Sequence, residues 1–246
     1  MSDIGKNFIK FTRYNLLPPS DQAMGLPQPP LQTVPQNAKE FIDLPTPEIS
    51  DENVKSFKTL AENRKSVRKY SDTPLSLEEL SFLLWCSQGV KKIAGDKATF
   101  RTVPSAGARH AIETYILVNN VTGLETGIYW YNALEHKISP IIISESIADK
   151  ITETCFSQKF VKESALTFIW VADIYRMSWR YVDRGFRYLF LDAGHICQNV
   201  YLAAESINCG ACAIAAYEDD DMNALLKLDI EKQFVIYLAT VGKKLR

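Results

Sequence analysis

Residues 184–206, RGFRYLFLDAGHICQNVYLAAES, form the longest amphipathic stretch in this chain of 246 residues. Apolar side chains recur there at spacings of three and four residues, which is the period of an α-helix. The stripe is wide, and a wide stripe indicates a helix that packs against neighbours on several sides. The stretch predicts a central helix ended by Gly210, with apolar positions Phe186, Leu189, Phe190, Ala193, Ile196, Cys197, Val200, Tyr201 and Ala204.

Shorter helices and strands are predicted around this helix. The capping box Ser76-Leu77-Glu78-Glu79 begins a helix that should end near Gly89, and Ser50 is expected to cap another that ends near Asn63. Further helices are expected at 144–156 and 220–228, and strands at 114–121, 127–132 with a return to Pro140, 166–172, 211–217 and 234–241. Because these elements are interspersed without strict alternation, they predict an α+β fold with a mixed, mostly antiparallel sheet flanked by helices.

The first 50 residues differ from the rest in their proline content. Eight of the 11 prolines fall between Pro18 and Pro47, and such a segment sustains neither a helix nor a central strand. We therefore expect two parts, an extended proline-rich arm over residues 1–50 and one domain over residues 51–246. The aromatic residues Phe8, Phe11 and Tyr14 are expected to anchor the arm to the domain.

Composition limits the classes of partner. A net charge of −1 argues against a surface that binds nucleic acid in general, so any basic patch must be local. The chain shows no signal peptide and no apolar run of about 18 residues, so no membrane association is expected. Five scattered cysteines without an export signal indicate reduced thiols and a cytoplasmic location.

The sharpest local feature is the basic run Arg64-Lys65-Ser66-Val67-Arg68-Lys69. Its guanidinium, ammonium and hydroxyl donors suit a phosphate monoester, which needs several donors converging from one side. The alternative is a solvated cluster of charges, which is common on protein surfaces. Residues 101–110 add a turn of small residues that permits close approach to a flat ligand, or that only leads into the next strand.

Other candidate chemistry is weaker. No GxGxxG, Walker A or GxSxG pattern occurs, so Rossmann, P-loop and hydrolase sites lack their signatures. The pair Cys209 and Cys212 has no second ligand pair for zinc and is expected to pack in the core at the end of the central helix. Asp192 and His195 share a helix face but do not make a metal site, so no metal is expected.

Several motifs in order resemble the nitroreductase superfamily and, within it, the SagB-type dehydrogenases. Arg64-Lys65-Ser66-Val67-Arg68 is similar to the family's opening R-[RK]-S-x-R motif, and residues 104–110 are similar to the branch's P-S-A-G-x-x-[HY] turn. The remaining similar segments are Phe8 to Tyr14, Ser20-Asp21-Gln22 and Gln28-Pro29-Pro30 in the arm, and Arg184 to Tyr188, Asp192 to His195 and Gln198-Asn199 in the central helix.

The resemblance implies a nitroreductase-like FMN-binding domain and a homodimer with FMN at the subunit interface. It also implies that NADH or NADPH donates hydride, which the flavin passes to a small-molecule acceptor. Arg64, Lys65 and Ser66 are expected at the phosphate and Arg68 near the flavin ring, which leaves Lys69 facing solvent. Other cofactor contacts implied by the resemblance are Pro104, Ser105, Ala106 and Gly107 across the interface, Gln158, Ala215 and Ala216 near the ring, and Lys243 and Lys244 at the phosphate.

One pair of residues departs from the branch. Members of the branch that oxidise azoline rings resemble one another in carrying a Lys-Tyr pair. At the matching positions this chain has Arg180-Tyr181. Arginine stays protonated and cannot act as the general base that lysine can become. This departure argues against oxidation of azoline rings in a modified peptide, which is kept as an alternative activity. Catalysis is expected from the flavin itself, with Tyr181 and Arg180 as the candidate catalytic side chains. A non-catalytic flavin-binding partner protein is the other alternative.

Overall fold

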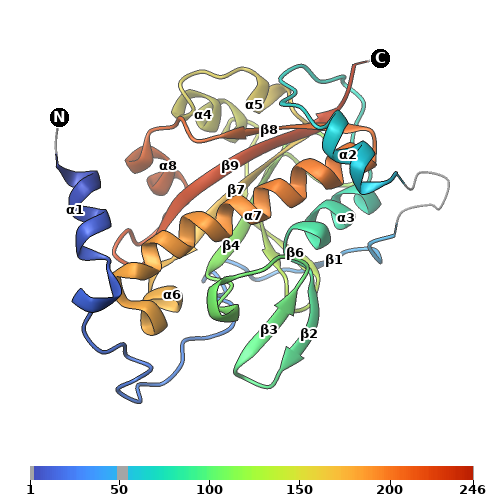
Figure 1. Ribbon diagram of the computed structural model, residues 1–246. Coiled ribbons are helices and arrows are strands. Elements are labelled where there is room, and N and C mark those ends of the chain that lie inside the picture. The colour runs from blue at the N-terminus through green and yellow to red at the C-terminus, as the bar shows by residue number, and fades with distance from the viewer. Residues whose placement is uncertain (1–2, 49–54, 246) are drawn as a thin grey trace.

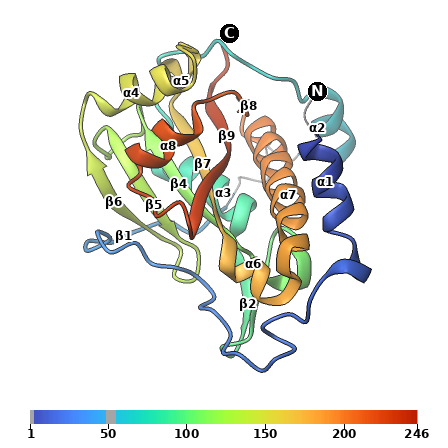
Figure 2. The ribbon, with the colours of Figure 1, turned by 90° about the vertical axis from the view of Figure 1, so that its left-hand side faces the viewer.

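A computed structural model describes residues 3–48 and 55–245, which form a seven-stranded sheet covered by helices on both faces (Figures 1 and 2). The order across the sheet is β1-β6-β5-β4-β7-β9-β8, and all neighbours pair antiparallel. The strands are β1 (Ile42–Asp43), β4 (Ile112–Val118), β5 (Gly127–Asn132), β6 (Lys137–Ile143), β7 (Leu166–Asp173), β8 (Cys209–Ile214) and β9 (Gln233–Lys243). A separate hairpin is made by β2 (Val90–Ala94) and β3 (Ala98–Arg101).

Helices cover the sheet in two layers. The long helix α7 (Gly185–Ser206) and α3 (Leu77–Gln88) pack on one face, and α4, α5 and α8 lie on the other (Figure 2). The remaining helical segments lie at the ends and edges of these layers. Their bounds are α1 Ile4–Phe11, α2 Phe57–Asn63, α4 Ile147–Thr154, α5 Phe160–Glu163, α6 Ile174–Tyr181 and α8 Asp219–Leu225, with short 3₁₀ turns at Tyr14–Leu16, Ala106–Ala108 and Val182–Arg184.

Side chains of the central strand β7 point alternately into the cores on the two faces of the sheet. Phe168 and Trp170 enter the core beneath α7, while Ile169 and Val171 enter the core beneath α4 and α8. This is the period of two that a strand imposes on its side chains. The stretch Leu166–Ala172, in which Thr167 is the one polar residue, is therefore buried on both faces, and the α+β fold class expected from the sequence is confirmed.

The central helix is confirmed from Gly185 to Ser206, with two corrections. Phe190 was expected in the core, but 56% of it is exposed, because it lies on a face of α7 that is exposed, with Leu191 and His195, in the described part of the chain. Gly210 does not end the helix. Ile207 caps α7, Asn208 takes a positive φ, and Gly210 already lies inside β8.

The helix starts and strand bounds were predicted with mixed accuracy. The capping box at Ser76 and Glu79 is present and α3 ends at Gly89 as expected. Helix α2 begins later than expected, at Phe57, because Ser56 accepts the N–H of Thr59; the predicted cap Ser50 lies outside the described residues. The strand expected at 114–121 runs over 112–118, since both N–H groups of 119–120 turn back to the Ala165 carbonyl.

The N-terminal arm is extended where it is rich in proline, but its beginning is helical. Residues 4–11 form α1, where Phe8 and Phe11 are 36% and 57% exposed, and Tyr14 of the following 3₁₀ turn is 65% exposed. Phe8 and Tyr14 nevertheless contact the start of α7, because the Arg187 guanidinium lies 5.8 Å from the centre of the Phe8 ring and the Tyr14 and Tyr188 hydroxyls are 2.7 Å apart. The carbonyl of Ile9 also accepts from the Arg187 guanidinium at 2.6 Å, so aromatic and polar contacts together hold the start of the arm against α7. The domain boundary expected at residue 50 lies outside the described residues.

The arm is fastened to the domain by a buried polar network. The Arg176 guanidinium of α6 lies 2.6 Å from the Glu113 carboxylate of β4, and both side chains are almost completely buried. Gln32 and Thr33 of the arm donate to the same carboxylate, each at 3.0 Å. Asp173 adds a second carboxylate 3.0 Å from Arg176. Although burial lowers it, the two carboxylates raise the pKa of Arg176 above its usual value.

No helix in the described part of the chain is long and apolar enough to cross a membrane.

Replacing Arg176 by Met should destabilise the protein strongly. The change leaves two carboxylates buried without their cation, and breaking a buried pair in this way costs about 3–5 kcal/mol. Urea denaturation measures the loss. The matched control is Lys162→Gln, which removes one partner of an exposed ion pair with Asp149 and should change the midpoint little. Equal midpoints for the two variants would contradict the role given to Arg176.

Candidate functional site

The basic run directly follows α2 and lies at the edge of the sheet, beside strand β8. Ser66 forms a parallel bridge with Ala211 of β8, and the Val67 N–H donates to the Ala211 carbonyl over 2.9 Å. Gly210 permits this approach, because a Cβ there would lie 2.6 Å from the Val67 side chain. Val67 thus packs onto the sheet, and Ser66 and Arg68 project the other way, as neighbours do in an extended segment.

The cations of the basic run are not neutralised by the described part of the chain. Across residues 3–48 and 55–245, none of Arg64, Lys65, Arg68 and Lys69 forms an ion pair. Arg64 is half-buried and the other three are exposed, which confirms that Lys69 faces solvent. Cations gathered on one segment without carboxylate partners create a local positive field that attracts an anion.

Tyr201 of α7 lies beneath the basic run and was assigned only to the apolar stripe. Its hydroxyl is 3.0 Å from the Ser66 hydroxyl and accepts the Ala213 N–H at 2.8 Å. The Arg64 guanidinium lies 5.3 Å from the centre of its ring. The helical spacing of apolar residues predicted that Tyr201 lies on the buried face of α7, but it does not predict what the tyrosine hydroxyl contacts.

Two loops beside the basic run are joined by Gln158. Its side-chain amide donates to the Cys155 carbonyl at 2.9 Å and to the Ala216 carbonyl at 3.2 Å. Ala215 and Ala216 directly follow β8 and are exposed. The structure therefore gathers Gln158, Ala215 and Ala216 with one another at the end of the sheet where the basic run lies.

The C-x-x-C pair lies in β8 rather than at the end of the helix. Cys209 and Cys212 are both buried, as expected of cysteines that pack in a core. Burial raises the pKa of Cys212, and the neighbouring Arg68 opposes this rise. Arg68 also lies over the Phe160 ring, 5.9 Å from its centre, which places its guanidinium between β8 and α5.

Lys243 and Lys244 both have carboxylate partners. Lys243 pairs with Glu79, the capping residue of α3, and Lys244 lies 2.5 Å from the Glu205 carboxylate. Their charge is largely neutralised within the chain, in contrast to that of the basic run. An anion near Lys243 and Lys244 is therefore attracted less strongly than it would be by two lysines without carboxylate partners.

The turn at residues 104–110 is held to α7 by Asp192. The Ser105 hydroxyl donates to the Asp192 carboxylate at 2.5 Å, and the Ala106 N–H donates to it at 3.2 Å. The Ser105 oxygen also accepts the His110 N–H at 2.8 Å. These contacts fix the turn, while Pro104 at its start stays exposed.

Gly107 brings the candidate pair Arg180-Tyr181 to the turn. It has a φ of +57°, and a Cβ there would lie 2.5 Å from the Tyr181 hydroxyl and 3.1 Å from the Arg180 side chain. No other residue type combines this backbone conformation with this closeness. The structure therefore unites Gly107, Arg180 and Tyr181, three residues singled out separately by the sequence.

The basic run and the turn do not meet within one chain. The run contacts α7 at Tyr201 and the turn contacts it at Asp192, nine residues earlier. Nine residues span about 14 Å of helix and two and a half turns, so the two contacts lie on opposite faces of α7. The expected site residues thus form two separate groups.

Burial controls the titration of two residues at the turn. It lowers the pKa of His110 to about 3, and the nearby Arg101 contributes in the same direction. It raises the pKa of Asp192, against the opposing hydrogen bonds from Ser105 and Ala106. His110 is therefore neutral near pH 7 and acts as a structural residue.

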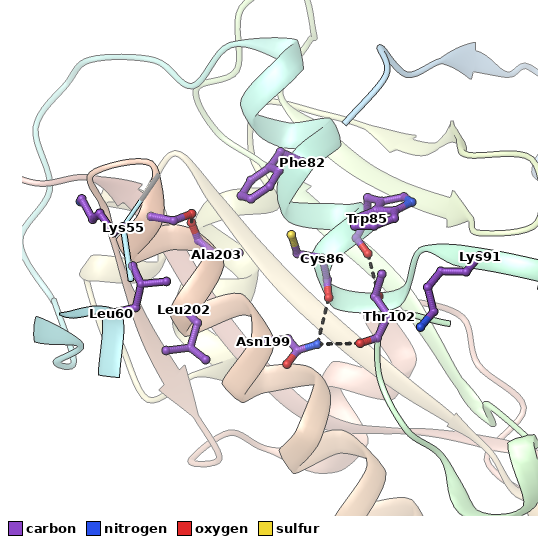
Figure 3. Close-up of a pocket in the computed structure, with 11 residues that line it drawn as sticks. Lys55, Leu60, Phe82, Trp85, Cys86, Lys91, Thr102, Asn199, Leu202 and Ala203 are labelled. Carbon is purple, nitrogen blue, oxygen red and sulfur yellow. Dashed lines mark hydrogen bonds between the residues drawn. The ribbon is translucent and has the colours of Figure 1, made fainter. Parts of the chain in front are cut away.

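A mainly apolar cavity of about 470 Å³ opens between α2, α3 and α7 (Figure 3). Cys86, Phe82 and Leu202 line it, and none of the residues expected at the cofactor does. Asn199 donates to the carbonyls of Cys86 and Thr102 at 3.0 and 3.4 Å, which joins α3 to the segment before the turn. The polar side chain of Asn199 is thus used to hold neighbouring segments together.

Comparison with known families and proteins gives one consistent result. The model described as the nitroreductase family matches residues 61–243. A protein of Methanocaldococcus jannaschii named as a nitroreductase is 37% identical over 182 residues, which are 74% of this chain and 88% of that protein. The trifolitoxin-processing protein TfxB of Rhizobium leguminosarum bv. trifolii is 30% identical over 133 residues, 52% of this chain and 36% of its own length.

Solved structures agree in fold. A crystal structure from Anabaena variabilis, named as a nitroreductase, is 28% identical with a TM-score of 0.71, covering 84% of this chain and 42% of that one. A nitroreductase from Desulfovibrio desulfuricans in complex with FMN superimposes with a TM-score of 0.55 at 14% identity, covering 77% of this chain and 86% of that one.

His110→Asn should flatten the dependence of stability on pH. Below about pH 6.5 an unfolded chain protonates this histidine, whereas the folded protein resists until about pH 3. Stability is therefore lost as pH falls through this window, by up to about 1.4 kcal/mol per pH unit. Asparagine tolerates the positive φ of position 110.

Urea midpoints measured between pH 7 and 4 check this expectation. His195→Asn, at an exposed position of the same helix that holds the turn, is the control for loss of a histidine. An unchanged slope in His110→Asn would show that the buried ring does not resist protonation.

Proposed function

The chain belongs to the nitroreductase family, a family of oxidoreductases, and on that premise we propose that it binds FMN and passes hydride from NADH or NADPH to a small-molecule acceptor. The flavin, when bound, supplies the hydride chemistry, and the protein supplies binding, orientation and charge. The FMN complex of the structural neighbour from Desulfovibrio desulfuricans supports this choice of cofactor.

The observation that carries the proposal is the set of cations in the basic run, which form no ion pair with any residue of the described ranges 3–48 and 55–245. A phosphate monoester needs several charged donors close together, and the consecutive residues Arg64, Lys65 and Ser66 offer a guanidinium, an ammonium and a hydroxyl. Tyr201 orients the Ser66 hydroxyl. The donor set therefore fits the phosphate of FMN.

The other expected contacts divide by charge and position. Arg68 follows two residues after Ser66 and lies between β8 and α5, where its positive charge would stabilise negative charge on the flavin ring. Gln158, Ala215 and Ala216 lie at the same end of the sheet and would contact the ring. Lys243 and Lys244 would add less at the phosphate, because each already has a carboxylate partner.

We propose further that the protein is a homodimer in which the turn of one copy lines the flavin held by the basic run of the other. Pro104, Ser105, Ala106 and Gly107 cannot reach the run of their own chain, from which α7 separates them. Phe190 and Leu191 of α7 are 56% and 59% exposed, and such an apolar surface suits contact with a second copy. A cytoplasmic location completes the proposal.

Oxidation of an azoline ring in a peptide is the second candidate. It is supported by the similarity to the trifolitoxin-processing protein and by the Tyr181 hydroxyl beside Gly107. Arg180 speaks against it, because a guanidinium does not give up its proton to serve as a base.

Arg64→Gln and Arg68→Gln should each weaken FMN binding. A hydrogen bond to a charged group contributes about 1.5–3 kcal/mol, so each loss should raise the dissociation constant roughly tenfold to a hundredfold. Quenching of FMN fluorescence measures the affinity. Lys69→Gln removes a charge from the same run, where the side chain faces solvent, and should change the affinity little. Unchanged binding in the double variant Arg64→Gln/Arg68→Gln would refute the phosphate site.

Anaerobic mixing of the FMN-loaded protein with each candidate donor identifies the activity. Loss of the oxidised flavin absorbance with NADH or NADPH is the expected result. Bleaching by an azoline-containing peptide alone would favour the second candidate. A flavin that stays oxidised with every donor would indicate a non-catalytic flavin-binding protein.

A further inference from the structure

A second cavity, of about 490 Å³, lies beside the turn and is separate from the basic run. Its wall combines Gly107 of the turn with residues of α6, of the β2–β3 hairpin and of the arm. The residues used below are Arg109, Arg180, Lys97, Asp96, Gln22 and Gln28. Figure 2 shows the arm passing beneath α6 and the tip of the hairpin, where these elements meet.

The arm closes this cavity through hydrogen bonds to backbone carbonyls, one from the Gln22 backbone and two from the Gln28 side chain. The Gln22 N–H donates to the Trp179 carbonyl at 2.9 Å, and the Gln28 amide donates to the carbonyls of Asp96 and Lys97 at 2.9 and 3.0 Å. The arm therefore fixes the distance between the hairpin tip and α6. A wall tied at both edges is a built cavity rather than a gap between loops.

Positive charge dominates the cavity. Three cations, Arg109, Arg180 and Lys97, face one carboxylate, that of Asp96. Arg180 forms no ion pair and no hydrogen bond with any residue in the ranges 3–48 and 55–245 that the structure describes. Its guanidinium thus keeps its donors for a ligand or for water.

Arg109 is buried and held rigidly. Its guanidinium donates to the Gly107 carbonyl at 3.3 Å and to the Lys97 carbonyl at 2.7 Å, and it stacks 5.4 Å from the centre of the Trp179 ring. Burial lowers the pKa of Arg109, and the like charge of Arg180 lowers it further. Two cations that repel each other beside a cavity are stabilised when an anion lies between them.

We propose that Arg109 and Arg180 bind a carboxylate or phosphate group of a substrate, so that the acceptor or the electron donor is selected for its negative charge. The guanidinium fork suits either oxyanion. This inference rests on the proposed function for the position of the cavity next to the flavin, since Gly107 belongs both to the cavity wall and to the turn expected to line the ring. The binding of an anion there does not depend on turnover.

Arg180 is then a specificity-determining residue rather than a base. A protonated guanidinium cannot accept the proton that an azoline oxidase removes, but it can hold a charged group in place. Arginine at position 180 changes what the Arg180-Tyr181 pair offers, from proton transfer to recognition of an anion.

Isothermal titration of the FMN-loaded protein with benzoate, with its neutral analogue benzamide and with pyrophosphate tests the inference. Benzoate or pyrophosphate should bind at least tenfold more tightly than benzamide, and Arg180→Gln should weaken the anion roughly tenfold to a hundredfold. Lys92→Gln removes an exposed cation from the same hairpin, outside the cavity wall, and should leave binding unchanged. Added salt should weaken the anion and spare benzamide.

The outcomes of this experiment identify the source of the anion. Arg180-dependent binding of benzoate indicates an acidic acceptor, and a KM for 4-nitrobenzoate that rises in Arg180→Gln while that for 4-nitrobenzamide stays constant agrees with it. Arg180-dependent binding of pyrophosphate alone indicates the dinucleotide donor. Equal binding of charged and neutral probes, or anion binding that Arg180→Gln leaves unchanged, overturns the inference even if the flavin is reduced normally. Arg180-dependent anion binding by the flavin-free protein, should FMN fail to bind, leaves the inference standing while the proposed function falls.

Discussion

The ion pair between Arg176 and Glu113 is the contact on which the arrangement of the domain depends. Removing two charges from water is costly, and only complete pairing with further hydrogen bonds offsets that cost. The domain alone does not complete the network: Gln32 and Thr33 of the arm supply donors to the Glu113 carboxylate. The arm is therefore part of the core rather than an appendage, although its sequence is rich in proline and its first helix is exposed.

The same ion pair positions the turn relative to α6. Arg176 donates from Nη1 to the His110 carbonyl at 3.1 Å, at the end of the turn that begins at Pro104. One helical turn later, α6 carries Arg180 and Tyr181 to Gly107. A buried charge near the middle of the molecule thus sets the geometry of an exposed cavity. Asp192 holds the other end of the turn, so the turn is fixed at two points by two different helices.

Periodicity and capping patterns predicted most of the fold, because they report local backbone preferences and the burial of whole faces. They identified α7, the capping box at Ser76 and the strand doubly buried in the centre of the sheet. They placed Phe190 in the core wrongly, since an apolar face looks the same whether it packs within the chain or remains exposed. The network around Glu113 was out of reach, because its members are separated by up to 144 positions along the sequence and share no spacing. The motifs supplied the residues of the candidate site but not the distance between its two groups.

Helix α7 fixes the spacing between the turn and the basic run. The turn is attached at Asp192 and the basic run at Tyr201, so the number of residues between them fixes both the distance and the relative direction of the two attachments. Inserting or deleting a single residue there would rotate one attachment by about 100° relative to the other. The loops and the hairpin can change length without disturbing this relation, whereas the segment between Asp192 and Tyr201 cannot. Variation in length among proteins with this site should therefore avoid this segment and gather elsewhere.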